Sequence, residues 1–549
     1  MPAIKGNSTF RTAAATRPEW VAAGVLVAGA FAVVLAALPY KAFDLERFYV
    51  PKELALFVTA AAAAVFLLDR ARQLAVGWVD ALLAGWLALS IASAAAAPNW
   101  WLATGAVGVS LAGATTFWVA RALGRTRLAY LVAAGLAGAC VVASGTALLQ
   151  AYGLVESDYV SLSRAPGGTL GNRNFVAHLA AIGLPALILV VLETRRALGV
   201  LLGAVGVGIS SWMLVLSRTR AAWLGLALSG GVLLVAAWRF RHLVLSGKAG
   251  RRILLLALFA GGGAVAALAL PNRLRWRTDN NPYLETALGV VNFREGSGRG
   301  RVIQFRNSVE LALDNPVLGV GPGNWSVEYP GVAERGDPSL NGEGMTSNPW
   351  PSSDWAAFLS ERGLPAFLLL VGVFLALGAE ALRKLLAART ATEAREALAL
   401  AGTLLVTAVV GAFDAVLLLG APSLIAWGLF GILAPPGSRW TIWLSEGVQH
   451  SLLVVAATVG AILIVRSSSQ IVAMSVYPDV GLRRTGPLAQ LRAIERASRA
   501  DPGSYRLHMR AATSLADRGN CRRARIHAEA ARYLYPRAPE PARILRRCR

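Results

Sequence analysis

The sequence predicts an all-α, polytopic transmembrane bundle of about 12–13 spans, with a large external loop and a small helical C-terminal tail. Of its 549 residues, 55% are hydrophobic and only 15% are charged, and the mean hydropathy is +0.52. Soluble domains carry about a quarter charged residues. Apolar runs of roughly 17 to 25 residues, the length at which a helix crosses a bilayer, recur from Trp20 to about Val465.

The predicted membrane domain covers residues 20–466 and follows a cytoplasmic N-terminal segment, residues 1–19. This segment has cations but lacks a short apolar region with its own cleavage site, so we expect the first span to be retained as an anchor. The expected spans lie near residues 20–38, 53–68, 74–97, 101–120, 128–152, 174–192, 198–216, 221–237, 253–270, 363–379, 397–419, 422–435 and 451–465.

Cations on alternate connections predict the orientation, because Lys and Arg resist translocation across the membrane. The connections expected inside hold Arg70/Arg72, Arg121 to Arg127, Arg195/Arg196, Arg239 to Arg252 and Arg383 to Arg395. The external loop, about residues 271–355, then lies on the other side. With an odd number of spans, we expect the tail, residues 467–549, to be external as well and therefore periplasmic. One miscounted span would move it to the cytoplasm.

The formal charge of +23 does not indicate a nucleic-acid partner, since it is divided between the inside loops and the tail. From Ser467 onward the tail holds seventeen arginines, no lysine and six acids, which leaves +11. Two interpretations stay open. The arginines are a solvated face that reflects composition, or they attract anionic membrane lipids or acidic polysaccharide.

Residues 491–545 place apolar and small residues at helical spacing, with breaks at DPGS and DRGN. This pattern resembles one tetratricopeptide repeat with flanking helices, in which small residues let neighbouring helices approach. A lone repeat buries its own face poorly, so we expect the tail to dock on the membrane domain, on a partner such as a polysaccharide-assembly protein, or on another copy.

The three cysteines have different expected environments. Cys140 lies in an apolar span and is expected to pack as a small core residue. Cys521 begins one predicted helix and Cys548 ends the next, so an antiparallel pair would bring them together. We expect a disulfide if the tail lies in an oxidising compartment, and two unpaired thiols otherwise.

The stretch DNPVLGVGPGNW, with Gly319, Gly321 and Gly323, is typical of a backbone that closes tightly around something. It lacks the Gly-Lys-Ser/Thr of a P-loop and the surrounding βαβ unit of a dinucleotide fold. Two interpretations remain: an external turn with a purely structural role, or a loop that shapes a substrate cavity.

Four motifs occur in order on one predicted side: GGTLGNRNFVAHL (167–179), VLSRTRAAWLGL (215–226), SGRGRVIQF leading into DNPVLGVGPGNW, and SERGLPAF (360–367). Together they resemble the O-antigen ligase and O-antigen polymerase family, over roughly residues 40 to 435. The resemblance implies a multi-pass protein of the bacterial inner membrane. It also implies transfer or polymerisation of an undecaprenyl-diphosphate-linked glycan at the outer face, by an inverting reaction that uses no metal or cofactor, onto a glycan, lipid or protein acceptor.

The resemblance also names site residues. Arg220 matches the arginine of the family's Arg-Gly-Ala-Trp-like motif, with Arg218 beside it, and Arg301 matches a second family arginine. An arginine makes bidentate contacts to phosphate oxygens, so these residues are expected to hold the diphosphate, although head-group snorkelling or a solvated loop charge would also explain them.

Polar residues of the first motif are further candidates for substrate binding. Asn172, Arg173 and Asn174 are expected to contact sugar hydroxyls or phosphate; alternatively, Asn172 caps the following helix. His178 is expected to be a packing residue rather than a base.

The sequence departs from the family where many relatives carry His-Asn-Asp-Tyr-Leu. The corresponding residues here run from Ser352 to Ala356, and the histidine thought to activate the acceptor is missing. We expect Asp354 to be the catalytic base, unless it only stabilises a helix start, in which case Glu361, another residue or no protein base serves. The alternative function is a non-catalytic scaffold for polysaccharide export or assembly.

Overall fold

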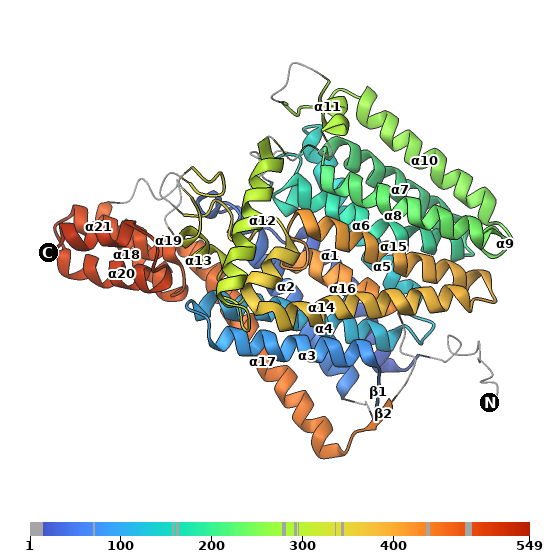
Figure 1. The fold of residues 1–549 in the computed structure, drawn as a ribbon, viewed down its shortest axis with the longest axis horizontal. Coiled ribbons are helices and arrows are strands. Elements are labelled where there is room, and N and C mark those ends of the chain that lie inside the picture. Colours follow the sequence, from blue (N-terminus) through green and yellow to red (C-terminus); the bar gives the residue numbers. More distant parts are fainter. Residues whose placement is uncertain are drawn as a thin grey trace.

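The computed structural model describes residues 15–549 except 70–71, 156–158, 161–163, 277–280, 290–291, 293, 295, 335, 342–344, 435–439 and 478–485. Residues 1–14 of the expected N-terminal segment, and Arg70 of the expected inside loops, therefore lie outside the described residues. The described chain is a bundle of long helices with a compact helical tail at one end (Figure 1).

Thirteen helices occupy the thirteen predicted segments, the third of which begins with a strand. They are α1 (Arg17–Leu35), α2 (Glu46–Leu68), α3 (Trp78–Ala95), α4 (Trp100–Leu123), α5 (Ala129–Ala151), α6 (Arg173–Glu193), α7 (Ala197–Ser217), α8 (Arg220–Arg239), α10 (Ala249–Ala269), α14 (Asp354–Leu386), α15 (Ala391–Phe413), α16 (Gly420–Leu433) and α17 (Glu446–Val476). Within the described ranges, twelve helices are long and apolar enough to cross a membrane, and the shorter α16 is apolar as well. The predicted fold class is confirmed.

Several helices extend beyond their apolar runs because protein, rather than lipid, covers their polar ends. In α2, which begins seven residues before the predicted span at 53, Arg47 and Lys52 are buried. The Lys52 ammonium donates to the carbonyl of Thr169 at 2.7 Å. Hydropathy alone places such helix starts too late, since it treats every cation as an end of the span.

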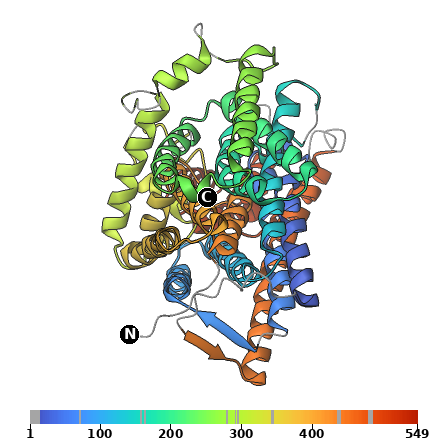
Figure 2. The same ribbon diagram turned by 90° about the vertical axis from the view of Figure 1, so that its right-hand side faces the viewer.

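The sequence analysis missed a small antiparallel sheet of β1 (Gln73–Val76) and β2 (Trp440–Trp443). β1 occupies the start of the segment predicted as the third span. Figure 2 shows the two strands side by side at the bottom of the view, next to the lower end of α17. Their pairing joins the connection before α3 to the connection before α17, so both connections lie at the same end of the bundle.

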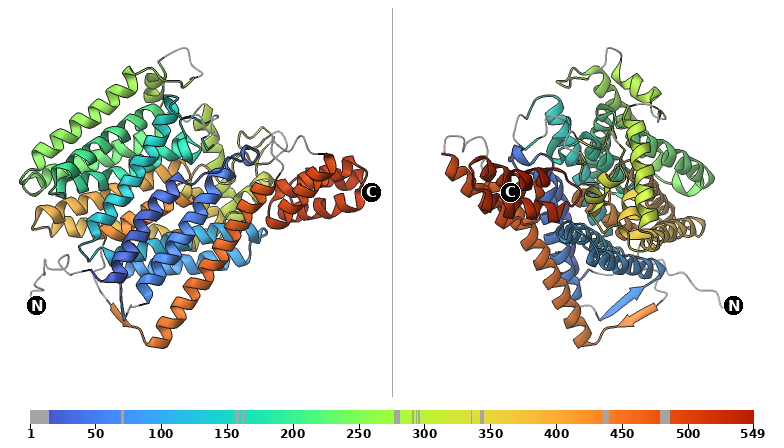
Figure 3. Two further views of the ribbon diagram at one scale, coloured as in Figure 1. Left: turned by 180° about the vertical axis from the view of Figure 1, so that it is seen from behind. Right: turned by 60° about the vertical axis from the view of Figure 1, so that its left-hand side comes forward.

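α17 runs from β2 to the tail (Figure 3). At about 1.5 Å per residue its 31 residues span roughly 46 Å, so the tail and the sheet lie at opposite ends of the bundle. The tail also contacts the large loop, through an ion pair of 2.8 Å between Arg537 and Glu328. The tail and the loop of residues 271–355 therefore share one end, as an odd number of spans requires.

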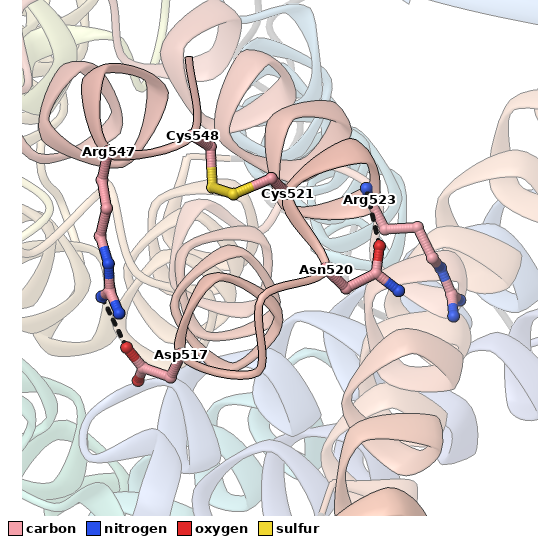
Figure 4. The surroundings of a disulfide bond; sticks show 6 residues. All are labelled: Asp517, Asn520, Cys521, Arg523, Arg547 and Cys548. Carbon is pink, nitrogen blue, oxygen red and sulfur yellow. Dashed lines mark hydrogen bonds and ion pairs between the residues drawn. A yellow bond between two sulfur atoms is a disulfide. The ribbon is translucent and has the colours of Figure 1, made fainter.

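The tail consists of α18 (Pro487–Ala500), α19 (Tyr505–Asp517), α20 (Cys521–Leu534) and α21 (Glu540–Arg547). The predicted breaks at DPGS and DRGN separate α18, α19 and α20. Cys521 and Cys548 form the predicted disulfide, with their Cα atoms 5.0 Å apart (Figure 4). Cys140 is a buried free cysteine, as predicted. The tetratricopeptide resemblance stays a prediction.

Short elements complete the chain between the long helices. They are η2 (Lys41–Phe43), η3 (Gly168–Leu170), α9 (Arg241–Val244), α11 (Pro282–Leu288), α12 (Gly296–Asp314), α13 (Trp325–Glu328) and η4 (Tyr329–Gly331). α11, α12, α13 and η4 belong to the large loop, and α12 lies against the start of α14 (Figure 1). The loop therefore brings its own helices to the end of the bundle.

Candidate active site

The glycine-rich loop packs against a break in α14. Gly319, Gly321 and Gly323 have positive φ angles of 65°, 96° and 71°. The amide of Val320 donates to the carbonyl of Ser360 at 3.0 Å, and the amide of Gly321 donates to the carbonyl of Glu361 at 2.8 Å. The loop thus satisfies carbonyl groups that the interrupted helix leaves without intrahelical partners.

The break itself lies at Gly363, whose φ of 77° and ψ of 169° are not helical. The next amide, of Leu364, donates to the carbonyl of Pro316 at 2.8 Å. Glu361 is 1% exposed, and its Oε1 accepts from the amide of Trp325 at 3.4 Å. The motifs DNPVLGVGPGNW and SERG are therefore one structural unit, which favours the structural interpretation of the three glycines.

Arg220 and Arg301 come from different elements and line one small cavity together with Phe413. Arg220 is the first residue of α8, and its Nη1 donates to the carbonyl of Gly289 at 2.6 Å. Arg301 lies on α12, is about a quarter exposed, and also lines an adjoining cavity of about 250 Å³ beside Ser352. The structure brings together the two arginines that the resemblance singled out.

Asp414, which sequence reasoning missed, connects the elements of this site. Its Oδ2 lies 3.9 Å from Nη2 of Arg301 and accepts from Nδ2 of Asn174 at 3.0 Å. Asn174 in turn accepts from the hydroxyl of Thr219 at 3.2 Å. Nε2 of His178 lies 3.9 Å from the same Oδ2, and the ring is fully buried. One carboxylate therefore links α6, the α7–α8 turn, α12 and the α15–α16 turn.

The signal for Asp414 in the sequence is slight. It is a single acid at the end of an apolar span, in GAFDAV, and ionisable residues at such positions are functional candidates by default. No spacing connects it to its partners, since they lie far away in the chain.

Arg173 and Arg218 form a second group, around Trp276. Their guanidinium carbons lie 4.9 Å and 4.8 Å from the centre of the indole ring, within cation–π range. Nε of Arg218 donates to the hydroxyl of Thr286 at 2.8 Å, and its Nη2 lies 3.9 Å from Glu285. Burial is the main cause that lowers the pKa of Arg218 from its ordinary value. These two arginines thus hold the large loop against the bundle.

Asn172 caps α6, because its Oδ1 accepts from the amide of Asn174 at 3.0 Å. The capping alternative therefore describes its observed contact. Of the three polar residues in this motif, the structure brings Asn174 to Asp414, places Arg173 over Trp276, and leaves Asn172 at the helix start.

Asp354 does not face the cavity. It is 1% exposed, its Oδ1 accepts from the amide of Val416, and its Oδ2 accepts from the amide of Leu417, each at 2.9 Å. These amides belong to the α15–α16 turn, which begins at Asp414. The contacts favour the structural alternative, in which Asp354 fixes the turn that carries Asp414.

A comparison with known families matches the part of the chain that holds several of these residues. The sequence model described as O-antigen ligase matches residues 205–371, a segment that contains Arg220, Arg301, the glycine-rich loop and the break in α14. No curated protein matches the chain. Over the matched segment, the chain is similar to the O-antigen ligase family.

Proposed function

We propose that this protein transfers an undecaprenyl-diphosphate-linked glycan to an acceptor hydroxyl at the outer face of the bacterial inner membrane. The match of residues 205–371 to the O-antigen ligase model supports a membrane glycan-transfer role. The observation that carries the finer proposal is that Arg220 and Arg301 meet around one small hollow at the end of the bundle, beside the cavity of about 250 Å³ that Arg301 also lines. A lipid diphosphate is anchored at the level where spans end, and two guanidinium groups provide fixed, permanent charge for it.

In the proposed reaction the acceptor oxygen attacks the anomeric carbon of the donor sugar. The bond from that carbon to the phosphate oxygen breaks, and the electron pair leaves with the diphosphate. Arg220 and Arg301 stabilise this departing charge. The attack comes from the face opposite the leaving group, so the configuration at the anomeric carbon inverts.

We propose that Oδ2 of Asp414 takes the proton of the acceptor hydroxyl. This is the role of the family's histidine, which this sequence lacks. Asp414 is the carboxylate that contacts Arg301, and its side chain is about a tenth exposed. Nη2 of Arg301 lies 3.9 Å from this carboxylate, and the neighbouring Phe413 lines the cavity of Arg301. Asp354, the base expected from the sequence, acts here as a positioning residue through the amides of Val416 and Leu417.

The test replaces Arg220 and Arg301 by Lys, one at a time, and measures glycan transfer in cells. Lysine keeps the charge but loses the planar fork, so we expect transfer to fall by about 10²-fold or more. The matched control is Arg306→Lys on the same helix α12. Arg306 is exposed, and its guanidinium forms an ion pair of 3.0 Å with the exposed Glu334. Normal transfer in both site variants would contradict the proposal.

Deletion of the gene separates the two forms of the reaction. Loss of long surface chains indicates a polymerase, whereas accumulation of full-length lipid-linked chains indicates a ligase. Surface glycan that is reduced in amount but unchanged in chain length and attachment would support the scaffold alternative.

A further inference from the structure

A cavity of about 1050 Å³ lies between the tail and the end of the bundle. Its walls come from the start of α2, the end of α17, the loop around residue 345, and the tail helices α18, α19 and α21. Figure 3 shows how the tail lies against this end of the bundle. The volume is at the upper end of ligand pockets, which are typically about 300–1,000 Å³.

The lining mixes aromatic faces with donors and acceptors. The rings of Tyr505 and Tyr535 lie 4.9 Å apart, and the hydroxyl of Tyr505 donates to Oε2 of Glu540 at 2.5 Å. Nη1 of Arg506 donates to the carbonyl of Ala42 at 2.8 Å, so this guanidinium is held at the wall of the cavity. Aromatic side chains with polar tips fit ligands that present both C–H faces and hydroxyl groups.

The charges that line the cavity nearly balance. Four carboxyl groups and three guanidinium groups face it: Asp44, Glu46, Asp501, Glu540, Arg506, Arg510 and Arg543. A site for a polyanion would present an excess of cations, and a site for a lipid chain would be mainly apolar. The lining therefore fits a polar, uncharged chain of hydroxyl-bearing units.

One segment of the loop connects this cavity to the arginines. Met345 and its neighbours to Pro349 line the tail cavity, whereas Pro351, Ser352 and Ser353 line the cavity of Arg301. Extended chain covers about 3.3 Å per residue, so the nine residues 345–353 reach up to roughly 30 Å. One loop segment thus contributes residues to both cavities.

Trp350 lies in the chain between the loop residues that line the two cavities. Its ring is edge-on to Tyr49, with centroids 5.4 Å apart, and 6.3 Å from Phe175. Tyr49 also lines the tail cavity, and Phe175 neighbours His178 at 6.4 Å. A row of neighbouring rings, Tyr49, Trp350 and Phe175, therefore extends from the tail cavity to His178, which lies 3.9 Å from Asp414.

We propose that the tail cavity binds several sugar units of the glycan whose end reacts at Arg220 and Arg301. This inference rests on the proposed function. The bound class is an extended oligosaccharide. The tail would hold the chain at a distance from the reacting end, so that longer glycans bind more tightly than a single repeat unit.

The test measures binding to the purified full-length protein in lipid nanodiscs. The probe is the glycan released by mild acid from the host's lipid-linked intermediates, labelled at its reducing end and separated by number of repeats. It lacks the diphosphate. We expect the dissociation constant to fall as repeats are added, and to rise by about tenfold or more in Thr513→Trp, because Thr513 is an exposed residue that lines the cavity.

Ile526→Trp is the matched control, since Ile526 is 61% exposed on α20 and is not part of the cavity lining. Ser347→Trp fills the cavity from the loop side, so it tests the proposal independently of the fold of α19. Arg301→Lys should bind this probe normally while losing transfer, which separates the two proposals. Native binding in both cavity variants, or no binding by the native protein, would overturn the inference and leave the arginine site untouched.

Discussion

The guanidinium of Arg301 lies 3.9 Å from Oδ2 of Asp414, and this pair joins the large loop to the membrane bundle. Arg301 belongs to α12 in the loop, whereas Asp414 directly follows α15. The side chains are about a quarter and a tenth exposed, so water screens their attraction only in part. A loop displacement would separate the two charges, so the pair makes the geometry of the site depend on the docked loop.

Asp414→Asn tests whether Asp414 takes the proton of the acceptor hydroxyl. The amide keeps the size of the side chain and an oxygen for Asn174, but it is not a base. We expect transfer to fall by about 10²-fold or more at normal protein abundance, the usual contribution of a general base. The measurement is glycan transfer in cells, with Glu285→Gln as the control, since Glu285 is more than half exposed and lies by Arg218. Full activity of the Asn variant would remove Asp414 from the mechanism.

Asp354→Asn separates a positioning role from a catalytic one. Both oxygens of Asp354 accept backbone amides, and an amide side chain can accept with only one of them. We expect a loss of about 1–3 kcal/mol in stability, seen as a lower melting temperature in detergent, together with reduced transfer. A variant that melts like the native protein but transfers no glycan would restore the catalytic interpretation.

The sequence predicted the spans and the two arginines but not the whole site, for physical reasons. Apolar runs and cations next to spans are local signals, so α1 to α8 and Arg220 could be located in advance. Asp414 could not, because its contacts to Asn174 and Arg301 form only when distant elements meet. The glycine-rich loop was ambiguous because positive φ angles serve both anion binding and close packing.

Gly321→Ala and Gly363→Ala test the joint between the loop and α14. Their φ angles are 96° and 77°, and an added Cβ would overlap Ala97 at the first position and the carbonyl of Val317 at the second. Strain of this kind costs on the order of 1–3 kcal/mol, so we expect a lower melting temperature for each variant. Gly378→Ala is the control on the same helix, since its added Cβ would meet open space. Equal melting of all three would show that the joint does not stabilise the fold.

The last prediction concerns the disulfide between Cys521 and Cys548, which closes the two C-terminal helices (Figure 4). The bridged residues are 27 positions apart, and a crosslink of that length stabilises a fold by about 3–4 kcal/mol in the chain-entropy estimate. We therefore expect the Cys521→Ser/Cys548→Ser variant to be cut faster by protease within α21, although an ion pair of 2.7 Å between Arg547 and Asp517 remains. In native cells a thiol reagent should label these cysteines only after reduction, while the buried Cys140 provides an internal control that reacts only after denaturation. Labelling of both tail cysteines without reduction would place the tail in the reducing cytoplasm, and the outer-face assignment of the arginine site, which shares its end of the bundle, would fail with it.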